Sequence, residues 1–415
     1  MFNMIPRKSF FGAAIGTMIE YYDYALFSIF LPIMAPLFFP ADTVYQSLVK
    51  GYFVMLITMA ARPLGALWFG YLGDVYGRRK ALLTSMYGIA IATVAIGLIP
   101  TYAVAGSLAT VIIILGKSVQ IFCFGGEYNG AGIYVVEHAE SNRQGIVGSL
   151  LTATTLFGSL IAAVIGIIVT AKFMPDWSWR IAFILGGLIG VFGIFYRRNL
   201  LESPGFTEAN PEREGILPLI KKFPTELFSG FFIGGFATAP FTTVLVFVNP
   251  VLMSKGLLTN HELMWLQTLY TLVAIITLIP AGFLADKLVP RKVMMASSLC
   301  LVVLAYPLLR IVDSGHVVYQ ILALCGLIIL NEMLLGPSNA YLKNIFPAHF
   351  RYRGSSLGFT VGMSLLGGLT PVIESYLYKY SGHFSTISIW LMFIGTGTFL
   401  GLHLVKRKHC RLIKP

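Results

Sequence analysis

The chain has 415 residues, of which 56% are hydrophobic and only 12% are charged, and its formal net charge is +12. Soluble domains contain about a quarter charged residues, so this composition excludes a water-soluble fold and favours a protein whose solvent is the bilayer. The positive charge does not indicate nucleic-acid binding, because Lys and Arg lie in short clusters between apolar segments rather than on one soluble domain.

Apolar segments follow one another along almost the whole chain. Each run of about 20 mostly apolar residues is long enough to cross roughly 30 Å of hydrocarbon as a helix. The sequence therefore predicts an all-α membrane protein with twelve transmembrane helices in two six-helix, pseudo-symmetric bundles. In chain order we expect the helices at residues 10–38, 48–73, 80–100, 106–137, 145–171, 179–197, 225–254, 262–288, 292–312, 316–345, 354–380 and 385–405.

Lys and Arg gather before the first predicted helix and in the loops after the even-numbered helices. Positively charged loops face the cytoplasm, so we expect both termini there, with the protein in the cell inner (plasma) membrane. The longest loop divides six helices from six. We therefore expect an N-terminal bundle at 1–197, a cytoplasmic linker at 198–224, a C-terminal bundle at 225–406 and a short cytoplasmic tail at 407–415.

One segment occurs at equivalent places in the two halves. The run GYLGDVYGRRK at 70–80 recurs as GFLADKLVPRK at 282–292, displaced by 212 positions. In each copy an acid, Asp74 or Asp286, ends one helix and faces basic residues that open the next, Arg78 with Arg79 or Arg291. A merely positive cytoplasmic loop explains the arginines but not the repeated acids. We predict that these residues gate the cytoplasmic side, because the acids can pair with arginines or helix N-termini and release them on opening.

The first copy of this repeat carries a recognisable pattern. Gly73-Asp74-x-x-Gly77-Arg78-Arg79 resembles the signature loop that follows the second helix in the major facilitator superfamily. The resemblance implies the major facilitator fold and adds Gly73 and Gly77 to the gating residues. In the second copy Val289 and Pro290 replace the glycine and the first arginine.

Further motifs narrow the resemblance to the metabolite:proton symporter family, which includes carriers of proline and betaine, shikimate, citrate and 2-oxoglutarate. They are Gly16-x-x-x-Glu20-Tyr-Tyr-Asp23-Tyr, Arg62-Pro-Leu-Gly65, Gly125-Gly-Glu127-Tyr, Trp177-x-Trp-Arg180-x-x-Phe183 and Glu202-Ser-Pro204-x-Phe206. The resemblance is dense over residues 1–206 and mainly topological beyond. One departure falls in the fourth helix, where Ile121 and Cys123 replace a glycine and a serine that are common in the family.

The first half carries ionisable residues at membrane depth, where charge is costly and usually serves function. Glu20, Asp23, Tyr24 and Phe27 share one face of the first helix, with Asp23 near mid-membrane. Arg62 in the second helix lies at a similar depth and can meet Asp23. Because burial favours the neutral form of a carboxylic acid, we predict that Asp23 or Glu127 takes up a coupled proton, with Glu20 as a further candidate. The alternative is a fixed ion pair that holds the helices together.

The fourth predicted helix carries a polar track of Lys117, Gln120 and Glu127 on one face. A buried ammonium needs an anionic partner, and the family often has Arg or Lys at this position, so we predict that Lys117 holds a substrate carboxylate. Arg62, Tyr24 and Gln120 join it as predicted substrate-binding residues. Snorkelling of Lys117 or its pairing with an acid is the alternative.

The second half is poorer in charge. Asn331 and Glu332 lie in the middle of the tenth predicted helix, and Glu374 lies in the eleventh. We include Asn331 and Glu332 among the predicted substrate-binding residues, with a packed hydrogen bond between helices as the alternative. The asymmetry favours an N-terminal half that handles the proton and a C-terminal half that shapes the pocket.

Together these features predict a secondary active transporter that imports a small carboxylate-bearing metabolite or zwitterionic osmolyte with protons by alternating access. A proton-independent facilitator or exchanger and a non-transporting membrane sensor are the alternatives. No phosphate loop, zinc-protease motif or nucleophile elbow occurs, and the cysteines are scattered. We therefore expect no enzyme activity, no cofactor and no metal. The expected partners are the substrate, protons and the lipid bilayer, with no nucleic acid and no obligatory protein partner.

Overall fold

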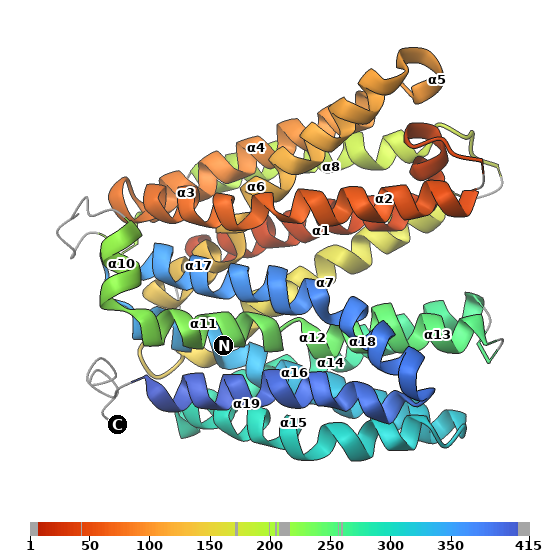
Figure 1. Cartoon of the computed structure of the whole chain (residues 1–415). Helices are drawn as coiled ribbons and strands as arrows, with labels where there is room; N and C mark the ends of the chain where they lie inside the picture. The colour runs from red at the N-terminus through yellow and green to blue at the C-terminus, as the bar shows by residue number, and fades with distance from the viewer. Residues whose placement is uncertain are drawn as a thin grey trace. The chain divides into compact units, whose positions relative to one another are not determined.

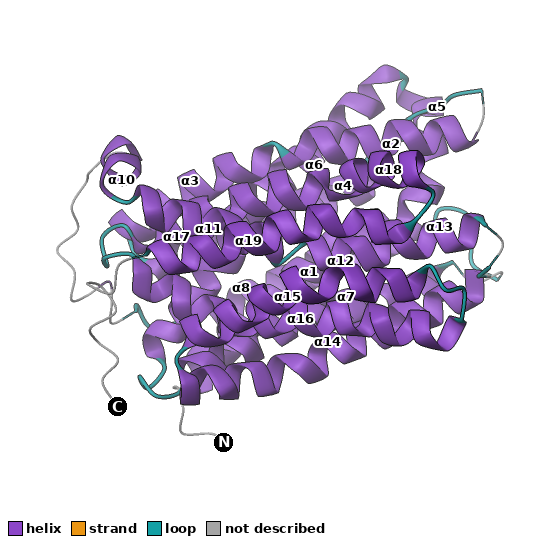
Figure 2. Cartoon of the chain, turned by 60° about the horizontal axis from the view of Figure 1, so that its bottom comes forward, coloured by secondary structure: helices purple, strands orange, loops and turns teal. Residues whose placement is uncertain are grey.

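A computed structural model describes residues 7–42, 44–170, 173–198, 200–203, 206, 216–255, 257, 258 and 260–405. Part of the predicted linker, at 199, 204, 205 and 207–215, lies outside the described residues, as does the predicted tail at 407–415. Over the described residues the chain forms helices and short connections without a β-strand (Figure 2).

The helices of the first half are long and closely packed. Figure 1 shows α3, α4 and α6 running side by side. The elements are α1 (Arg7–Phe38), α2 (Val44–Met59), α3 (Ala61–Val75), α4 (Arg78–Leu98), α5 (Tyr102–Ala105), α6 (Ser107–His138), α7 (Gln144–Val169) and α8 (Trp179–Arg198).

The second half contains more interruptions. Its elements are α10 (Ile216–Lys222), α11 (Pro224–Phe236), α12 (Ala239–Thr242), the π-helix η1 (Thr243–Val248), α13 (Asn249–Ser254), α14 (Asn260–Leu288), α15 (Pro290–Val312), α16 (Val317–Ile345), α17 (Arg351–Gly362), the π-helix η2 (Met363–Gly367), α18 (Gly368–Ser381), the 3₁₀-helix η3 (Phe384–Ile387) and α19 (Ser388–Leu404).

The helical segments have the length and the apolar composition that a membrane-spanning helix requires. Among the described residues, 11 helical segments are long and apolar enough to span a bilayer. The 32-residue α1, which carries Glu20 and Asp23 in its middle, is long enough to be a further span. These spans correspond to the predicted helices, with ends that differ by a few residues.

Proline explains three interruptions within predicted spans. Proline has no N–H to donate to the carbonyl four residues earlier, and its ring crowds that carbonyl. The last residues before the breaks are Met59, Phe236 and Gly367, and Pro63, Pro240 and Pro371 lie four positions after them. The second, seventh and eleventh predicted helices are therefore each locally irregular, and each still forms one helical span, as the sequence predicted.

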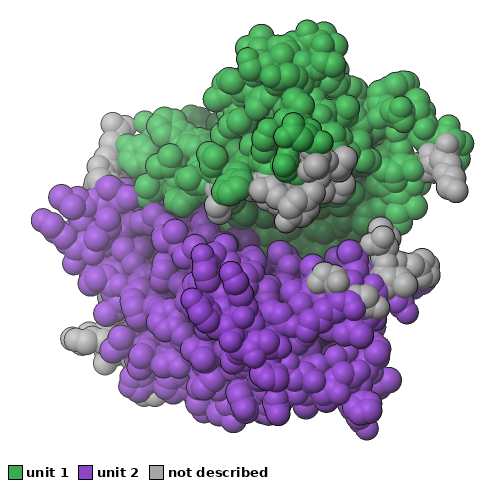
Figure 3. Space-filling view, turned by 45° about the vertical axis from the view of Figure 1, so that its right-hand side comes forward, with its two compact units in different colours: residues 1–138, 153–212 green, residues 139–152, 213–415 purple. Residues whose placement is uncertain are grey.

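Contacts between Cα atoms divide the chain into two compact units (Figure 3). Unit 1 comprises Met1–His138 and Ala153–Glu212, and unit 2 comprises Ala139–Thr152 and Arg213–Pro415, so the boundary runs through α7. The same pairs of helices pack within each unit. In unit 1, α4 packs on α6 and α8, and α3 packs on α6; in unit 2, α15 packs on α16 and α19, and α14 packs on α16. The repeat seen in the sequence therefore extends to the helix packing.

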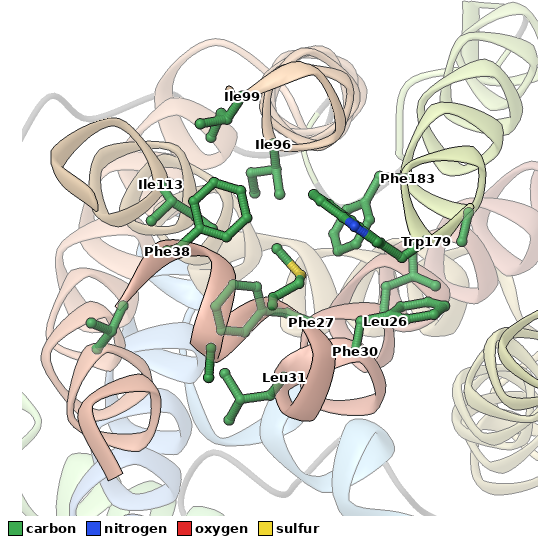
Figure 4. Packing of buried hydrophobic residues seen from close by; sticks show 14 of the residues in the cluster. Leu26, Phe27, Phe30, Leu31, Phe38, Ile96, Ile99, Ile113, Trp179 and Phe183 are labelled. Atoms are coloured by element: carbon green, nitrogen blue, oxygen red, sulfur yellow. The ribbon is translucent and has the colours of Figure 1, made fainter. Parts of the chain in front are cut away.

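An apolar cluster anchors the middle of α1. Figure 4 shows Leu26, Phe27 and Phe30 of α1 packed with side chains that include Ile96 of α4 and Phe183 of α8. Leu26, Phe27 and Phe30 follow Asp23 by three, four and seven residues, so they share its helix face. This packing fixes the rotation of α1 and directs Asp23 toward α4 and α8.

Candidate functional site

Asp23 and Lys117 are the two ends of a buried chain of hydrogen bonds in unit 1. The Thr93 hydroxyl of α4 donates to Asp23 Oδ2 at 3.1 Å, and Gln120 Nε2 donates to Thr93 Oγ1 at 2.8 Å. Lys117 Nζ donates to Gln120 Oε1 at 2.7 Å. All four side chains are at most 2% exposed. The acid and the cation are thus joined through two neutral groups rather than by a direct ion pair.

Gly186 of α8 makes room for this acid. An added Cβ at Gly186 would overlap Asp23 Oδ1, so a larger residue cannot occupy the position without moving the carboxylate. Asp23 Oδ1 has no hydrogen-bond partner among the described residues. One oxygen of Asp23 is therefore held by Thr93, and the other faces α8 unpaired.

Tyr24 lies between two buried cations. The Arg62 guanidinium carbon is 5.9 Å from the Tyr24 ring centroid, and Lys117 Nζ is 5.8 Å from it. Lys117 Nζ also lies 4.8 Å from the Phe27 ring. Such distances fit cation–π contact. The predicted substrate-binding residues Arg62, Tyr24, Lys117 and Gln120 are thus close neighbours in unit 1.

Arg62 does not pair with Asp23, although their depths made a meeting possible. Within the described residues no ion pair links them, and Asp23 takes Thr93 as its partner. Arg62 approaches Tyr24 from α3. The two residues thus contact different partners, Thr93 and Tyr24.

Glu127 has a partner that the sequence did not reveal. It forms an ion pair with Arg197 of α8 and accepts a hydrogen bond from the Ser85 hydroxyl of α4. Arg197 is fully buried and also donates to the carbonyls of Gly12 at 3.3 Å and Leu82 at 3.0 Å. Arg197 and Arg198 end one span together, so both resembled ordinary positively charged residues of a cytoplasmic loop.

Glu20 lies between the two groups of charges. It is 2% exposed, and its Oε2 atom has no hydrogen-bond partner among the described residues. The charged groups that influence it are Glu127, Arg62, Arg197 and Asp23. Glu20 is therefore within electrostatic range of both Asp23 and the Glu127–Arg197 pair.

In the first copy of the repeated loop, in unit 1, Arg78 binds residues of the same loop. Arg78 Nη1 lies 2.9 Å from Asp74 Oδ1 and donates to the Gly73 carbonyl at 2.6 Å. Gly77 has φ +108°, a conformation that favours glycine, and an added Cβ there would overlap the Glu202 carboxylate. Arg78 and Asp74 are both buried, so this pair is held inside the protein.

Glu202 caps the helix that begins with this loop. Its Oε1 atom accepts from the backbone N–H groups of Arg78 at 2.9 Å and Arg79 at 3.3 Å, at the N-terminus of α4. The Phe206 ring lies 5.8 Å from the Arg78 guanidinium carbon. Arg79 in turn donates to the Arg198 carbonyl. Two motifs that are about 125 residues apart in the sequence thus form one structure.

The second copy makes a different contact in unit 2. Asp286 accepts hydrogen bonds from the backbone N–H groups of Gly145 at 2.6 Å and Ile146 at 2.9 Å, at the N-terminus of α7. Arg291 donates to the His403 carbonyl at 2.9 Å. Asp74 has therefore taken an arginine and Asp286 a helix N-terminus, which are the two kinds of partner that the repeat predicted.

Asn331 and Glu332 form a local pair in unit 2. Asn331 Nδ2 donates to Glu332 Oε1 at 2.9 Å, and both residues are buried. Glu332 Oε2 and Asn331 Oδ1 have no hydrogen-bond partner among the described residues. The pair has spare hydrogen-bonding capacity, and it belongs to a different unit from the Asp23 chain.

Family models match both halves of the chain. The model described as "Sugar (and other) transporter" matches residues 10–215, and that described as "Major Facilitator Superfamily" matches residues 231–409. The "Citrate-proton symporter" of Klebsiella pneumoniae is 30% identical over 390 residues, covering 91% of this chain and 87% of that protein. The "Proline/betaine transporter" of Escherichia coli (strain K12) is 28% identical over 406 residues, covering 94% and 81%.

Solved structures share the fold. The "proton:xylose symporter XylE" bound to 6-bromo-6-deoxy-D-glucose aligns with a TM-score of 0.78 at 16% identity, covering 97% of this chain and 96% of that one. The E. coli "Fucose:proton symporter, FucP (N162A)" aligns with a TM-score of 0.72 at 14% identity, covering 96% and 98%. The predicted fold and the resemblance drawn from the motifs are confirmed. This chain is a multi-pass membrane protein that belongs to the major facilitator superfamily.

Proposed function

We propose that the protein is a secondary active transporter that imports a small carboxylate-bearing metabolite or zwitterionic osmolyte together with protons by alternating access. In this proposal it lies in the inner membrane with both termini in the cytoplasm, and it acts as a carrier rather than an enzyme. The relatives named as proline/betaine and citrate–proton transporters support this substrate range. The observation that carries the proposal is the buried chain from Asp23 through Thr93 and Gln120 to Lys117.

The chain offers a way to couple the proton to the substrate. When Asp23 is ionised, its negative charge lies within electrostatic range of Lys117 and partly balances the ammonium. When Asp23 is protonated, that balance is lost and Lys117 attracts a substrate carboxylate more strongly. Protonation and substrate binding then favour each other by the same coupling free energy, as linkage requires.

Gln120 and Thr93, the two neutral residues between Lys117 and Asp23, connect the movement of one charged group to the other. Gln120 accepts from Lys117 and donates to Thr93, so movement of the ammonium toward a substrate pulls on the group that holds Asp23. Asp23 and Lys117 do not contact each other directly, so each of them can exchange its hydrogen-bond partner. A directly bonded pair such as Glu127–Arg197 is a better helix-to-helix anchor than a proton carrier.

Uptake into proteoliposomes tests the proposal. Radiolabelled proline, betaine, shikimate, citrate and 2-oxoglutarate are offered with and without an inward proton gradient to the wild type and to Asp23→Asn. We expect gradient-stimulated uptake of at least one compound by the wild type and its loss in the variant, because Asn keeps the shape but binds no proton. The control is Asp176→Asn, the same chemical change at an exposed acid. Uptake that ignores the gradient and survives Asp23→Asn would instead identify a facilitator.

A further inference from the structure

Glu374 in α18 is a fully buried acid of unit 2 without a cation beside it. Its only hydrogen-bond partner among the described residues is the Thr243 hydroxyl of η1, at 2.5 Å from Oε1, and its Oε2 atom is unpaired. The acids of unit 1 differ, because Glu127 is paired with Arg197 and both Glu20 and Asp23 have cations nearby. The cost of burying an ionised Glu374 carboxylate is therefore not offset by an ion pair of this kind.

Among the described residues, no charged group acts strongly on Glu374. The elements packed on α18 are α12, η1, η2, η3 and α19, and their described residues carry one ionisable side chain, His403, near the far end of α19. On α18 itself Lys379 is exposed to the surroundings rather than turned inward. The other titratable groups on or over α18 are Tyr376, Tyr378, Tyr380 and Lys255, whose Nζ lies 5.1 Å from the Tyr378 ring.

The geometry of Thr243 fits a neutral acid. Its Oγ1 atom lies 2.9 Å from the Ala239 carbonyl oxygen as well as 2.5 Å from Glu374 Oε1. A hydroxyl has one hydrogen to donate and can accept others. Thr243 can donate its hydrogen to Glu374 Oε1 or to the Ala239 carbonyl. When it donates to Ala239, a protonated Glu374 carboxyl can donate to Thr243 in turn, so this hydroxyl can serve the neutral acid as well as the carboxylate. The contact can therefore persist when Glu374 is a neutral carboxylic acid.

This contact joins two interrupted helices. Thr243 is the first residue of the π-helix η1, and Glu374 follows the π-helix η2 by seven residues. Short π-helical segments inside α-helices often mark functional sites, and helices bend most easily where their hydrogen-bond ladder is broken. One turn further along, the Phe247 ring lies 5.9 Å from the Tyr378 ring. The Thr243–Glu374 bond thus lies where the two helices can separate.

We propose that Glu374 is a second proton-carrying site, kept neutral by its burial, held by Thr243 and emptied when η1 and α18 separate. The proton binds a Glu374 carboxylate oxygen from water on one side of the membrane and leaves to water on the other, so no other bond is made or broken. This inference rests on the proposed proton-coupled transport and adds a proton to it. Asp23 in unit 1 remains the acid linked to substrate binding.

Infrared spectroscopy of the purified full-length protein tests the site without any substrate. The carbonyl stretch of protonated carboxylic acids is recorded over a pH series for the wild type, Glu374→Gln and the control Glu140→Gln, which alters an exposed acid. We expect Glu374→Gln to lose one component that the wild type and the control retain at neutral pH. An unchanged spectrum in Glu374→Gln would overturn the inference.

The second measurement is the proton-to-substrate ratio. It is obtained from reversal potentials in proteoliposomes with whichever of the five radiolabelled compounds the wild type accumulates. We expect Glu374→Gln to lower the ratio by about one while gradient-stimulated uptake persists, whereas Asp23→Asn abolishes that stimulation. A ratio that stays at the wild-type value in Glu374→Gln would reduce Glu374 to a structural hydrogen bond, even if Asp23 is confirmed. Gradient-independent uptake by the wild type would instead refute the proposed function itself.

A second variant keeps the test decisive if Glu374→Gln does not fold. Thr243→Val removes the hydroxyl but keeps the side-chain shape, and Thr243→Ser restores the hydroxyl. We expect Thr243→Val to shift the pH at which the infrared component disappears and Thr243→Ser to return it toward the wild-type value. An identical pH dependence in all three proteins would contradict the role assigned to the Thr243–Glu374 contact.

Discussion

Gly16 lies in α1 beside the Arg197 guanidinium, where an added Cβ would overlap Nη2 and Cζ. The glycine at the start of the first motif thus has a steric reason, because Arg197 passes through this space to reach Glu127. Gly186 does the same for Asp23 on another helix. In both places a glycine, which has no side chain, leaves the space that a buried charged group occupies.

The close contact between Gly16 and Arg197 predicts how much stability the protein loses when one methyl group is added at Gly16. We expect Gly16→Ala to displace Arg197 from Glu127 and to destabilise the protein by about 3–5 kcal/mol, the usual cost of breaking a buried ion pair. The measurement is the thermal unfolding midpoint of the detergent-purified protein. Gly368→Ala is the matched control, because an added Cβ there meets nothing within 4 Å and alanine favours a helix. Equal midpoints for the two variants would show that Arg197 adapts without losing its partner.

Cys123 illustrates a departure from the family pattern at the same scale. Its side chain is buried, and an added Cβ at Gly88 of α4 would overlap its sulfur. The larger sulfur in place of a serine oxygen therefore packs directly against a glycine of the neighbouring helix. The substitution is accommodated by packing between α4 and α6.

At the scale of elements, helix N-termini in both units are capped by carboxylates that lie far away in the sequence. Glu202 accepts from the first N–H groups of α4, and Asp286 from those of α7. The positive end of the helix dipole favours negative charge at both places. These contacts tie the loops at 76–79 and 139–144 to other segments of the chain.

The Asp286 contact is expected to contribute both stability and gating. Replacing Asp286 with Asn removes the charge and one acceptor oxygen, so we expect a loss of about 1–2 kcal/mol, within the range measured for helix caps. We also expect altered uptake kinetics, because in the predicted gate this cap breaks and re-forms as the protein opens and closes. Thermal unfolding and initial uptake rates check this, with Asp42→Asn at an exposed acid as the control. Wild-type values for both quantities would exclude Asp286 from the gate.

The distribution of positive charge belongs to the scale of the whole molecule. Lys and Arg occur at the starts of α4, α15 and α17 and at the ends of α8 and α14, which are the ends expected to face the cytoplasm. The intervening helices expose many large apolar side chains, as a surface in contact with lipid requires. The positions of Lys and Arg therefore predict which helix ends face the cytoplasm, and the exposed apolar side chains fit a surface in contact with lipid.

Reporter fusions test this orientation. We expect alkaline phosphatase, which is active only outside the cytoplasm, to be inactive when fused after Leu404 and active when fused after Gly382, between α18 and η3. A green fluorescent reporter, which fluoresces only inside, is expected to give the opposite pattern at the same two positions. Phosphatase activity after Leu404 would place the C-terminus outside and reverse the topology.

The sequence by itself determined the membrane class, the all-α fold, the repeat and the family. Those properties follow from the length of apolar runs, the spacing of charges and local motifs, which do not depend on how helices are rotated. It also identified Asp23, Glu127, Lys117, Gln120 and Arg62 as buried polar residues, because charge at membrane depth is visible in any long apolar run. The prolines at 63, 240 and 371 lie near local irregularities of their helices, but Pro280, Pro307 and Pro337 lie inside helices that stay regular, so proline alone does not decide.

The tertiary structure alone decided which polar groups meet. Asp23 contacts Thr93 rather than Arg62, Glu127 contacts Arg197, and Glu374 contacts Thr243. Each of these pairs joins helices far apart in the chain, and the partner depends on the rotation of both helices about their axes. That rotation is set by the packing of many apolar and glycine contacts at once, such as those around Leu26, Phe27 and Gly16, and no local pattern in the sequence encodes their sum.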